Sequence, residues 1–173
     1  DRPPFIIDEA DGSLDSLPKA LDLGYDGASH KNCKGIVKGI ANAGTLARAA
    51  AARNRPVHLT GEDLANVGPI ALLQDLAMMA TLGIQHVERN GHHYFRGLSA
   101  WPKPVQEAIL THHGDLYHRH ADGYPTLRIE NGKLSVSSLL TASFGVKPQL
   151  VLENLDAANL EDTPAFLAVG LPS

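Results

Sequence analysis

Short apolar runs alternate with longer helical stretches between residues 5 and 117, and this alternation restricts the possible folds of the chain strongly. Strands are expected within residues 5–8, 25–31, 57–60 and 84–88, and helices at about 16–23, 35–53, 69–82 and 105–117. Short strands separated by helices of this length form parallel βαβ units with right-handed crossovers. The sequence therefore predicts an α/β protein built on a parallel sheet.

The turn after the first predicted strand helps to choose between parallel folds. It lacks the Gly-rich phosphate fingerprint that opens a dinucleotide-binding Rossmann domain. Four consecutive βα units fit half of an eight-stranded TIM-type barrel, in which polar residues at the C-terminal ends of the strands carry the chemistry. Residues 1–121 are therefore expected to form four βα units of a (β/α)8 barrel, its C-terminal half.

The residues that follow carry a different pattern. Asn131-Gly132 lies between two β-prone runs, 126–130 and 133–136, and this dipeptide is a strong signal for a two-residue hairpin turn. Residues 150–171 show no clear period. Residues 122–173 are thus expected to form a C-terminal extension that contains a β-hairpin and lies outside the barrel.

The helix predicted at 35–53 is amphipathic. Its apolar positions recur at helical spacing, and its polar positions fall on another face. The first set is Ile36, Ile40, Ala43 and Ala47, and the second is Lys38, Asn42 and Arg48. The apolar set is the one expected to pack against the sheet.

Charge and cysteine content limit the partners and the compartment. The chain carries 15 Lys and Arg against 19 Asp and Glu, a net charge of −4 that disfavours nucleic acid as a partner. No apolar run approaches the roughly 20 residues needed to cross a bilayer, so no membrane partner is expected. Cys33 is the single cysteine, which excludes an internal disulfide and fits a reducing compartment. A cytoplasmic location is therefore expected.

Polar side chains follow each predicted strand. Asp8 and Glu9 come after the first, Lys31 after the second, Glu62 after the third, and His92 shortly after the fourth. The C-terminal ends of parallel strands share one edge, so these side chains are expected to surround a common cavity mouth, with His92 touching substrate. Carboxylate oxygens suit Mg²⁺, and burial or a nearby cation can lower the pKa of a lysine enough for it to act as a base.

Simpler explanations exist for each of these residues. Solvated loops carry acidic pairs such as Asp8-Glu9, lysines before a helix are often surface charges, and Glu62 precedes a helix whose dipole an acid stabilises. Four histidines near the last predicted helix lack the spacing of a metal-binding pair and are expected to lie at a solvated helix end. They are His112, His113, His118 and His120.

Two segments resemble the enolase superfamily, in its mandelate racemase and muconate-lactonizing enzyme branch. Phe5-Ile6-Ile7-Asp8-Glu9 is similar to the fifth barrel strand of that family, and residues 25–35 are similar to the sixth strand and its following turn. The resemblance implies that Asp8, with Glu9 as the alternative, is a metal ligand and that Lys31 is the catalytic lysine. Glu62 stands where the seventh strand often carries a glutamate, and the tail resembles the strands that return to the capping domain.

This resemblance implies an Mg²⁺-dependent lyase or isomerase. Such an enzyme abstracts the α-proton of a small carboxylate or acid-sugar substrate, as a dehydratase, cycloisomerase or racemase. The first four strands of the barrel would lie before residue 1, so the N-terminal half of the barrel is the expected partner. The alternative is a non-catalytic half-barrel fragment or interaction module that needs a separate N-terminal half. Open strand edges favour association, so an oligomer is expected.

Overall fold

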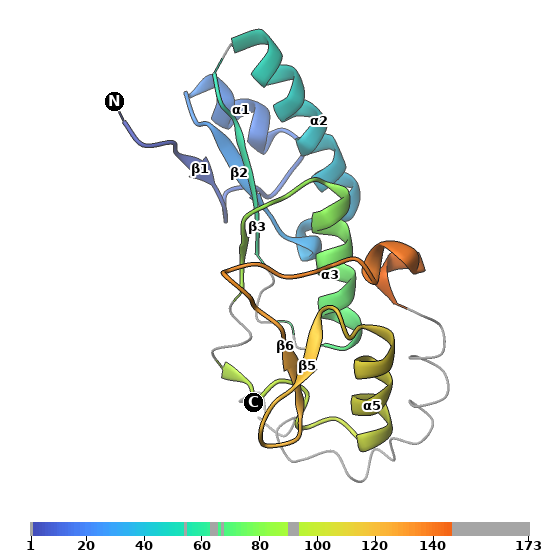
Figure 1. Cartoon of the computed structure of the whole chain (residues 1–173). Helices are drawn as coiled ribbons and strands as arrows, with labels where there is room; N and C mark the ends of the chain where they lie inside the picture. The colour runs from blue at the N-terminus through green and yellow to red at the C-terminus, as the bar shows by residue number, and fades with distance from the viewer. Residues whose placement is uncertain (1, 54, 63–65, 67, 90–93, 147–173) are drawn as a thin grey trace, which may run out of the picture.

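The computed structural model describes residues 2–53, 55–62, 66, 68–89 and 94–146 and has a mixed α/β fold (Figure 1). Its main sheet is parallel, with four strands in the order β1-β2-β3-β4. The strands are β1 (Ile6–Ile7), β2 (Gly27–His30), β3 (His58–Glu62) and β4 (Val87–Glu88). The predicted parallel α/β sheet is therefore confirmed, with each strand inside or within two residues of its expected range.

Helices connect the strands as the sequence predicts. They are α1 (Ser16–Asp22), α2 (Ile36–Arg53), α3 (Ile70–Thr81) and α5 (Lys103–His112), together with the short 3-10 helix η1 (Asn32–Lys34). Gly24 and Gly83 follow α1 and α3 with φ of 92° and 69°, the left-handed conformation in which glycine commonly ends a helix. The lengths of these helices explain why consecutive strands can pair in parallel.

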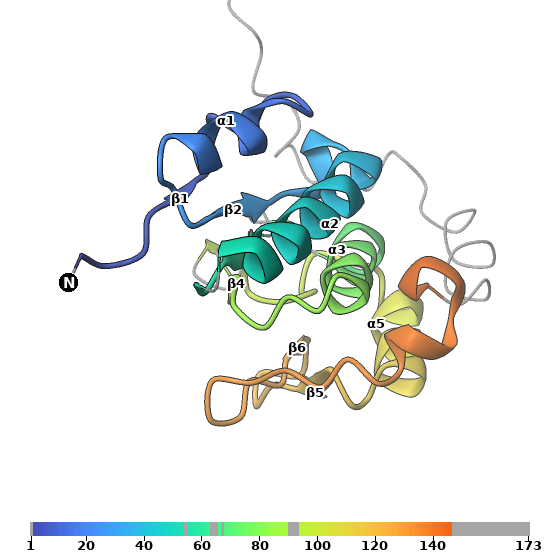
Figure 2. The ribbon, with the colours of Figure 1, turned by 90° about the horizontal axis from the view of Figure 1, so that it is seen from above.

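Two apolar clusters hold the described residues together. One packs α1 and α2 against the sheet through Leu17, Leu21, Ala28 and Leu46. The larger one surrounds α3 and includes residues from α5, β5 and the later chain: Leu72, Leu73, Leu76, Ala77, Met79, Leu98, Ile109, Leu116, Tyr117, Leu139 and Val146. Figure 2 shows α3 between α2 and α5. The helix α3 is therefore the central packing element of the molecule.

Leu73 gives a direct measure of this packing, because its side chain is fully buried at 0% exposure. We expect Leu73→Ala to lower the free energy of unfolding by about 3 kcal/mol, through lost apolar burial and the cavity left behind. Leu14 is 61% exposed, so Leu14→Ala is the matched control and should change stability by less than about 0.5 kcal/mol. Urea denaturation measures both, and equal midpoints for the two variants would contradict the central role of α3.

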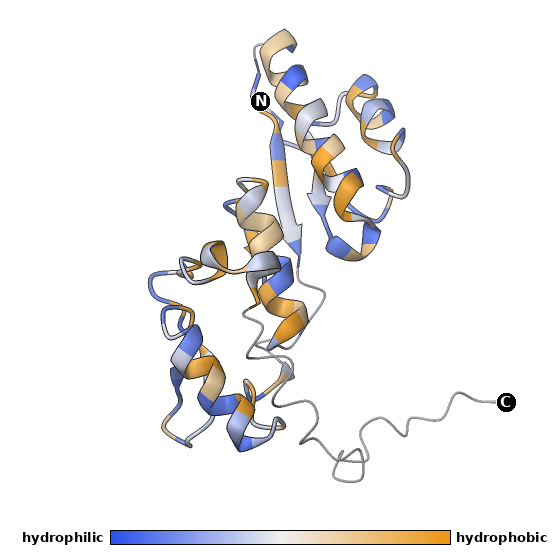
Figure 3. Ribbon diagram, turned by 90° about the vertical axis from the view of Figure 1, so that its right-hand side faces the viewer, coloured by the Kyte–Doolittle hydropathy of each residue, from blue (hydrophilic) through white to orange (hydrophobic). Residues whose placement is uncertain are grey.

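The faces predicted for the helix at 35–53, which is α2, are wrong. Ile36 and Ile40 are 40% and 54% exposed, whereas Asn42 is 4% exposed and faces the protein interior. Figure 3 shows the apolar colour along the N-terminal half of this helix. The physical reason is that a polar loop, the one after β1, packs on α2 and needs hydrogen-bonding partners there.

In residues 122–146 the predicted turn forms, but the strands pair differently from the prediction. Asn131 and Gly132 have φ of 51° and 71°, and the backbones of Glu130 and Lys133 pair across them, so the predicted turn is confirmed. The pairing does not extend into a ladder. Instead β5 (Tyr117–Arg119) pairs antiparallel with β6 (Pro125–Leu127) in a separate two-stranded sheet, because the run predicted to precede the turn finds its partner in β5.

That sheet also changes the end of the last helix. The predicted helix at 105–117 ends at His112, and Tyr117 begins β5. In Figure 1, α5 and the β5–β6 sheet lie at the opposite end of the molecule from α1 and β1. Within the described residues no helix is both long and apolar enough to span a bilayer. The boundary after residue 121 and the cytoplasmic location stay predictions.

Candidate functional site

The register of the sheet decides which side chains share a face. Ala28 of β2 packs in the cluster with α1 and α2, and a Cβ added to Gly61 of β3 would lie 3.0 Å from the sulfur of Met79 in α3. Positions 28 and 61 therefore face the helices. Side chains alternate along strands, so Lys31 and Glu62 face the opposite side, which we call the open face. Asp8 follows Ile7, which pairs with Ala28, and faces the same way.

Three carboxylates converge on the Lys31 ammonium at the C-terminal edge of this face. Lys31 Nζ lies 3.0 Å from Asp8 Oδ1, 2.5 Å from Glu9 Oε1 and 2.8 Å from Glu62 Oε2. Lys31 is 3% exposed and Glu62 14%, while Asp8 and Glu9 are 45% and 81% exposed. The predicted convergence of Asp8, Lys31 and Glu62 is confirmed. We call Lys31 and its three carboxylate partners, Asp8, Glu9 and Glu62, the Lys31 cluster.

Burial and charge act in opposite directions on Lys31. Burial alone lowers the pKa of its ammonium, but the hydrogen bonds that Lys31 donates to Glu62, Glu9 and Asp8 together outweigh burial and raise that pKa above its ordinary value. The hydrogen bond and charge of Lys31 in turn lower the pKa of Glu9. The cluster therefore holds Lys31 as an ammonium ion, and keeps Glu9 ionised, across the neutral range.

Helix α2 and η1 hold the loop that carries Asp8 and Glu9. Lys34 Nζ donates to the backbone oxygen of Asp8 at 2.8 Å, and Lys38 Nζ donates to the backbone oxygen of Asp11 at 2.9 Å. The Asp11 carboxylate also accepts a hydrogen bond from Lys38 and one from Asn42 at 3.0 Å. Lys34, Lys38 and Asn42 recur every four residues, so they form one stripe.

The sequence places Lys38 and Asn42 on the polar face of this helix and does not predict that they bind the loop after β1. Asp11 was missed as well, although it is 1% exposed and anchors the loop. The available signal was the i, i+4, i+8 spacing of three long or amide side chains directly after a strand. That spacing alone does not distinguish a solvated stripe from one that binds a loop.

The open face carries a hollow that lies before the Lys31 cluster along β2 and β3. A cavity of about 400 Å³ is lined by polar groups that include Ser29, Thr60, His86 and Glu88. Ser29 and Thr60 lie two residues before Lys31 and Glu62, so they occupy the same face. The volume falls within the range of small-molecule binding sites, about 300–1,000 Å³. The hollow and the Lys31 cluster together form the candidate site.

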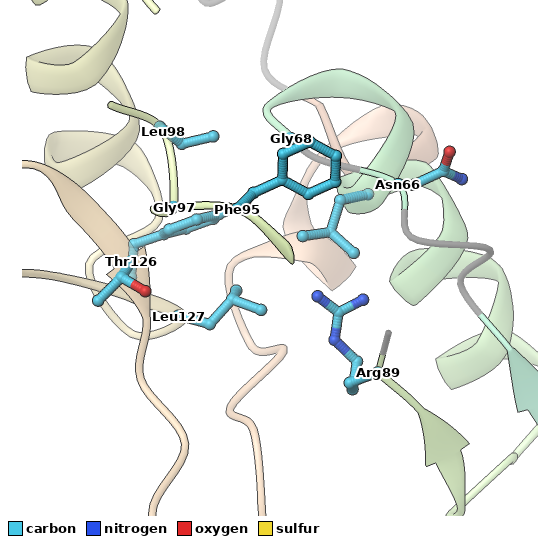
Figure 4. Close-up of a pocket in the computed structure, with 10 residues that line it drawn as sticks. Asn66, Gly68, Arg89, Phe95, Gly97, Leu98, Thr126 and Leu127 are labelled. Atoms are coloured by element: carbon cyan, nitrogen blue, oxygen red, sulfur yellow. The ribbon is translucent and has the colours of Figure 1, made fainter. Parts of the chain in front are cut away.

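A second cavity lies at the N-terminal end of α3, between Asn66, Arg89 and Phe95 (Figure 4). Its volume is about 30 Å³. One ordered water needs at least about 10–15 Å³ of such space, so this cavity has room for a water or two. It is too small to bind a substrate.

The carboxylates of the cluster have the donor chemistry that Mg²⁺ requires. Asp8 and Glu9 keep accessible oxygens, so each can supply a ligand. Among the described residues, however, no group of three or more His, Cys, Asp or Glu could hold a metal ion by itself. Asp8 and Glu9 could thus supply only part of a coordination sphere, and an Mg²⁺ ion bound there would need further ligands from elsewhere.

The described histidines fall outside this cluster. His92, predicted to touch substrate, lies outside the described residues. His113 was expected at a solvated helix end, but it is 0% exposed and its Nδ1 lies 2.9 Å from Ser138 Oγ. The expectation for His113 is therefore wrong, because residues 134–139 of the later chain cover the end of α5.

Comparisons with known proteins add no assignment. No family model matches the chain, and neither a curated protein nor a solved structure does. The function of this chain is therefore inferred from the residues and the geometry of the Lys31 cluster.

Proposed function

We propose that this chain supplies the C-terminal half of a (β/α)8 barrel in an Mg²⁺-dependent enzyme of the enolase superfamily. Its substrate is a small carboxylate or acid sugar, and its reaction is abstraction of the α-proton, as in a dehydratase, cycloisomerase or racemase. The observation that carries the proposal is the buried Lys31 ammonium held by Asp8, Glu9 and Glu62 at the C-terminal edge of a parallel sheet.

The open face supports a missing half-barrel. Parallel sheets are normally covered on both faces, and here α1, α2 and α3 pack on one. The other face carries the Lys31 cluster, and before it along β2 and β3 lies a hollow whose lining includes Ser29, Thr60 and Gly132. A polar, concave face of this kind fits the interior and mouth of a barrel better than an outer surface. The proposed partner is therefore the N-terminal half of the barrel, from another segment or chain.

The residues of the cluster have distinct proposed roles. Lys31, as an ammonium, stabilises the negative charge that develops when the carbon next to a carboxylate loses its proton. Lys31 can serve as the base only when another donor replaces it as the hydrogen-bond partner of the cluster carboxylates, because burial then lowers its pKa and leaves it neutral. Glu62 fixes the position of Nζ, and His92 contacts the substrate. Mg²⁺, held partly by Asp8 or Glu9, would supply positive charge beside the substrate carboxylate.

A specific observation favours a second candidate function. The described part of β1 pairs only with β2 and that of β4 only with β3, so both edges of the described sheet are open to association. The chain would then be a non-catalytic interaction module that forms an oligomer through its sheet.

Exchange of the substrate α-proton in D₂O separates the two functions. The assembly purified through a tag on this chain is incubated with a panel of carboxylates and acid sugars, with Mg²⁺ or with EDTA, and followed by proton NMR. If the assembly is the proposed enzyme, we expect an Mg²⁺-dependent loss of one α-proton signal. We also expect Mg²⁺ to raise the melting temperature of the wild type but not that of the Asp8→Asn/Glu9→Gln variant. A stable oligomer with no exchange and no Mg²⁺ effect would overturn the enzyme and support the interaction module.

A further inference from the structure

Helix α3 carries one charged residue, Asp75, and its side chain is buried. Asp75 is 6% exposed, in a helix whose other buried residues are apolar. Burial raises the pKa of its carboxyl group, and hydrogen bonds from Asn66 and Asn32 act against that rise. A buried carboxylate needs such partners, because its removal from water is unfavourable.

Asp75 joins two segments that carry the Lys31 cluster. Asn32 Nδ2 donates to Asp75 Oδ1 at 2.7 Å, and Asn66 Nδ2 donates to Asp75 Oδ2. Asn32 follows Lys31 directly, and Asn66 belongs to the segment after Glu62. One carboxylate in α3 therefore ties together the chain beyond β2 and the chain beyond β3, on the face of the sheet opposite the cluster.

The hydrogen bonds continue to the residue before Lys31. Asn32 Oδ1 lies 2.7 Å from His30 Nε2. Since the Asn32 amide nitrogen donates to Asp75, its oxygen must accept, and His30 Nε2 is the donor. His30 is 4% exposed, and its ring occupies the place where a Cβ on Gly39 of α2 would lie. Both neighbours of Lys31 are therefore held from the helix side.

We propose that Asp75 is a positioning residue for Lys31. Through Asn32 and His30 it fixes the backbone on both sides of Lys31, and through Asn66 it sets the distance to the strand that carries Glu62. The Lys31 ammonium contacts carboxylates from the loop after β1 and from β3 at the same time, so movement of its backbone breaks at least one of those contacts. Any catalytic consequence rests on the proposed function, whereas the positioning itself does not.

Two asparagines donate to Asp75, so the amide of Asn66 and the carboxylate of Asp75 can be exchanged between the two positions. In Asp75→Asn, an amide at position 75 that still accepts from Asn32 turns its nitrogen toward Asn66, and in the wild-type orientation of Asn66 two donors then meet. In the double variant Asp75→Asn/Asn66→Asp, the amide at 75 donates to the carboxylate at 66 and still accepts from Asn32. The double variant therefore restores both hydrogen bonds and the net charge.

Competitive acylation of lysines reports the position of Lys31. Limited acetic anhydride is added to the protein, and mass spectrometry compares Lys31 with Lys19, which is 76% exposed. Asp75→Asn should raise the Lys31:Lys19 ratio about tenfold or more, because a displaced ammonium becomes accessible and loses its hydrogen bonds, and the double variant should return it to within about twofold of wild type. Asp22→Asn, at an 85% exposed carboxylate, is the matched control and should leave the ratio unchanged.

A purely structural role for Asp75 predicts something else. If the role is only structural, Asp75→Asn lowers the melting temperature and leaves the acylation ratio unchanged, and that result overturns the proposal. A double variant whose Lys31 stays as reactive as in the single variant also overturns it. If Asp75→Asn does not fold, Asn32→Ala cuts the same link at a less buried residue and must raise the ratio. When the wild type shows no α-proton exchange but the ratios follow this pattern, positioning is supported and the proposed function fails.

Discussion

Lys31→Met is expected to reduce Mg²⁺-dependent α-proton exchange in the assembled enzyme by about 10²–10⁴-fold, the usual contribution of a positioned acid–base group. Methionine keeps the length and apolar stem of the side chain but removes the ammonium that lies within 3.0 Å of Asp8, Glu9 and Glu62. The measurement is the rate at which the substrate α-proton exchanges with D₂O. Retained exchange would show that Lys31 neither stabilises the developing charge nor moves the proton.

The same variant should lose stability in a defined pH range. Lys31 lowers the pKa of Glu9, so the pair stabilises the wild type above the ordinary glutamate pKa of about 4.3, and this contribution disappears as the pH falls through the lowered pKa. The raised pKa of Lys31 adds stability below the ordinary lysine pKa of about 10.4, and this is lost as the pH rises further. The difference between wild type and Lys31→Met should therefore be largest between about pH 5 and pH 10.

Lys34→Met is the matched control for charge. Lys34 Nζ lies 3.5 Å from Glu9 Oε2 and 3.9 Å from Asp8 Oδ1, so it contributes positive charge to the same carboxylates with weaker contacts. It should reduce exchange far less than Lys31→Met while still loosening the loop after β1. An equal loss in both variants would mean that the total charge, and not the position of Lys31, determines the activity.

Gly27→Ala should destabilise the protein by about 4 kcal/mol or more, and with it the site. Gly27 pairs with His58 across β2 and β3, and a Cβ at this position would overlap the backbone oxygen of His58. A backbone atom in a ladder cannot move aside without separating the strands. Since Lys31 and Glu62 come at the ends of these two strands, the cluster should be lost together with the pairing.

Gly44→Ala is the control for that substitution. Gly44 lies inside α2, with nothing within 4 Å of an added Cβ, so alanine should stabilise the helix by about 0.5–1 kcal/mol. Urea denaturation followed by circular dichroism measures both variants. A Gly27→Ala protein that unfolds at the wild-type urea concentration would contradict the described pairing of β2 with β3.

The helices and strands, and the approach of the cluster residues to one edge of the sheet, could be predicted because they depend on local patterns. The apolar alternation indicates where strands and helices begin and end, and parallel strands place their C-terminal residues at one edge. That was enough to predict the convergence of Asp8, Lys31 and Glu62. The alternation is also enough to set which face each residue occupies once one residue of a strand is placed.

Contacts between segments that are distant in sequence could not be predicted in the same way. Asn42 and Asp11 are buried because a loop packs on α2, and Thr126 and Leu127 pair with β5 although the Asn131-Gly132 turn offers another partner. Asp75 left a signal, an isolated acid in an apolar helix, but that signal does not say which side chains it meets. Each of these outcomes depends on segments distant in sequence that compete for the same hydrogen-bonding groups.

The amino-acid sequence by itself determined the order of strands and helices and the arrival of two acids, a lysine and a further acid at one edge of a parallel sheet. Only the tertiary structure decided the charge state of Lys31 and the support behind it. The reason is that burial and hydrogen bonding shift its pKa in opposite directions, and which of them prevails depends on distances of about 3 Å that no local pattern contains.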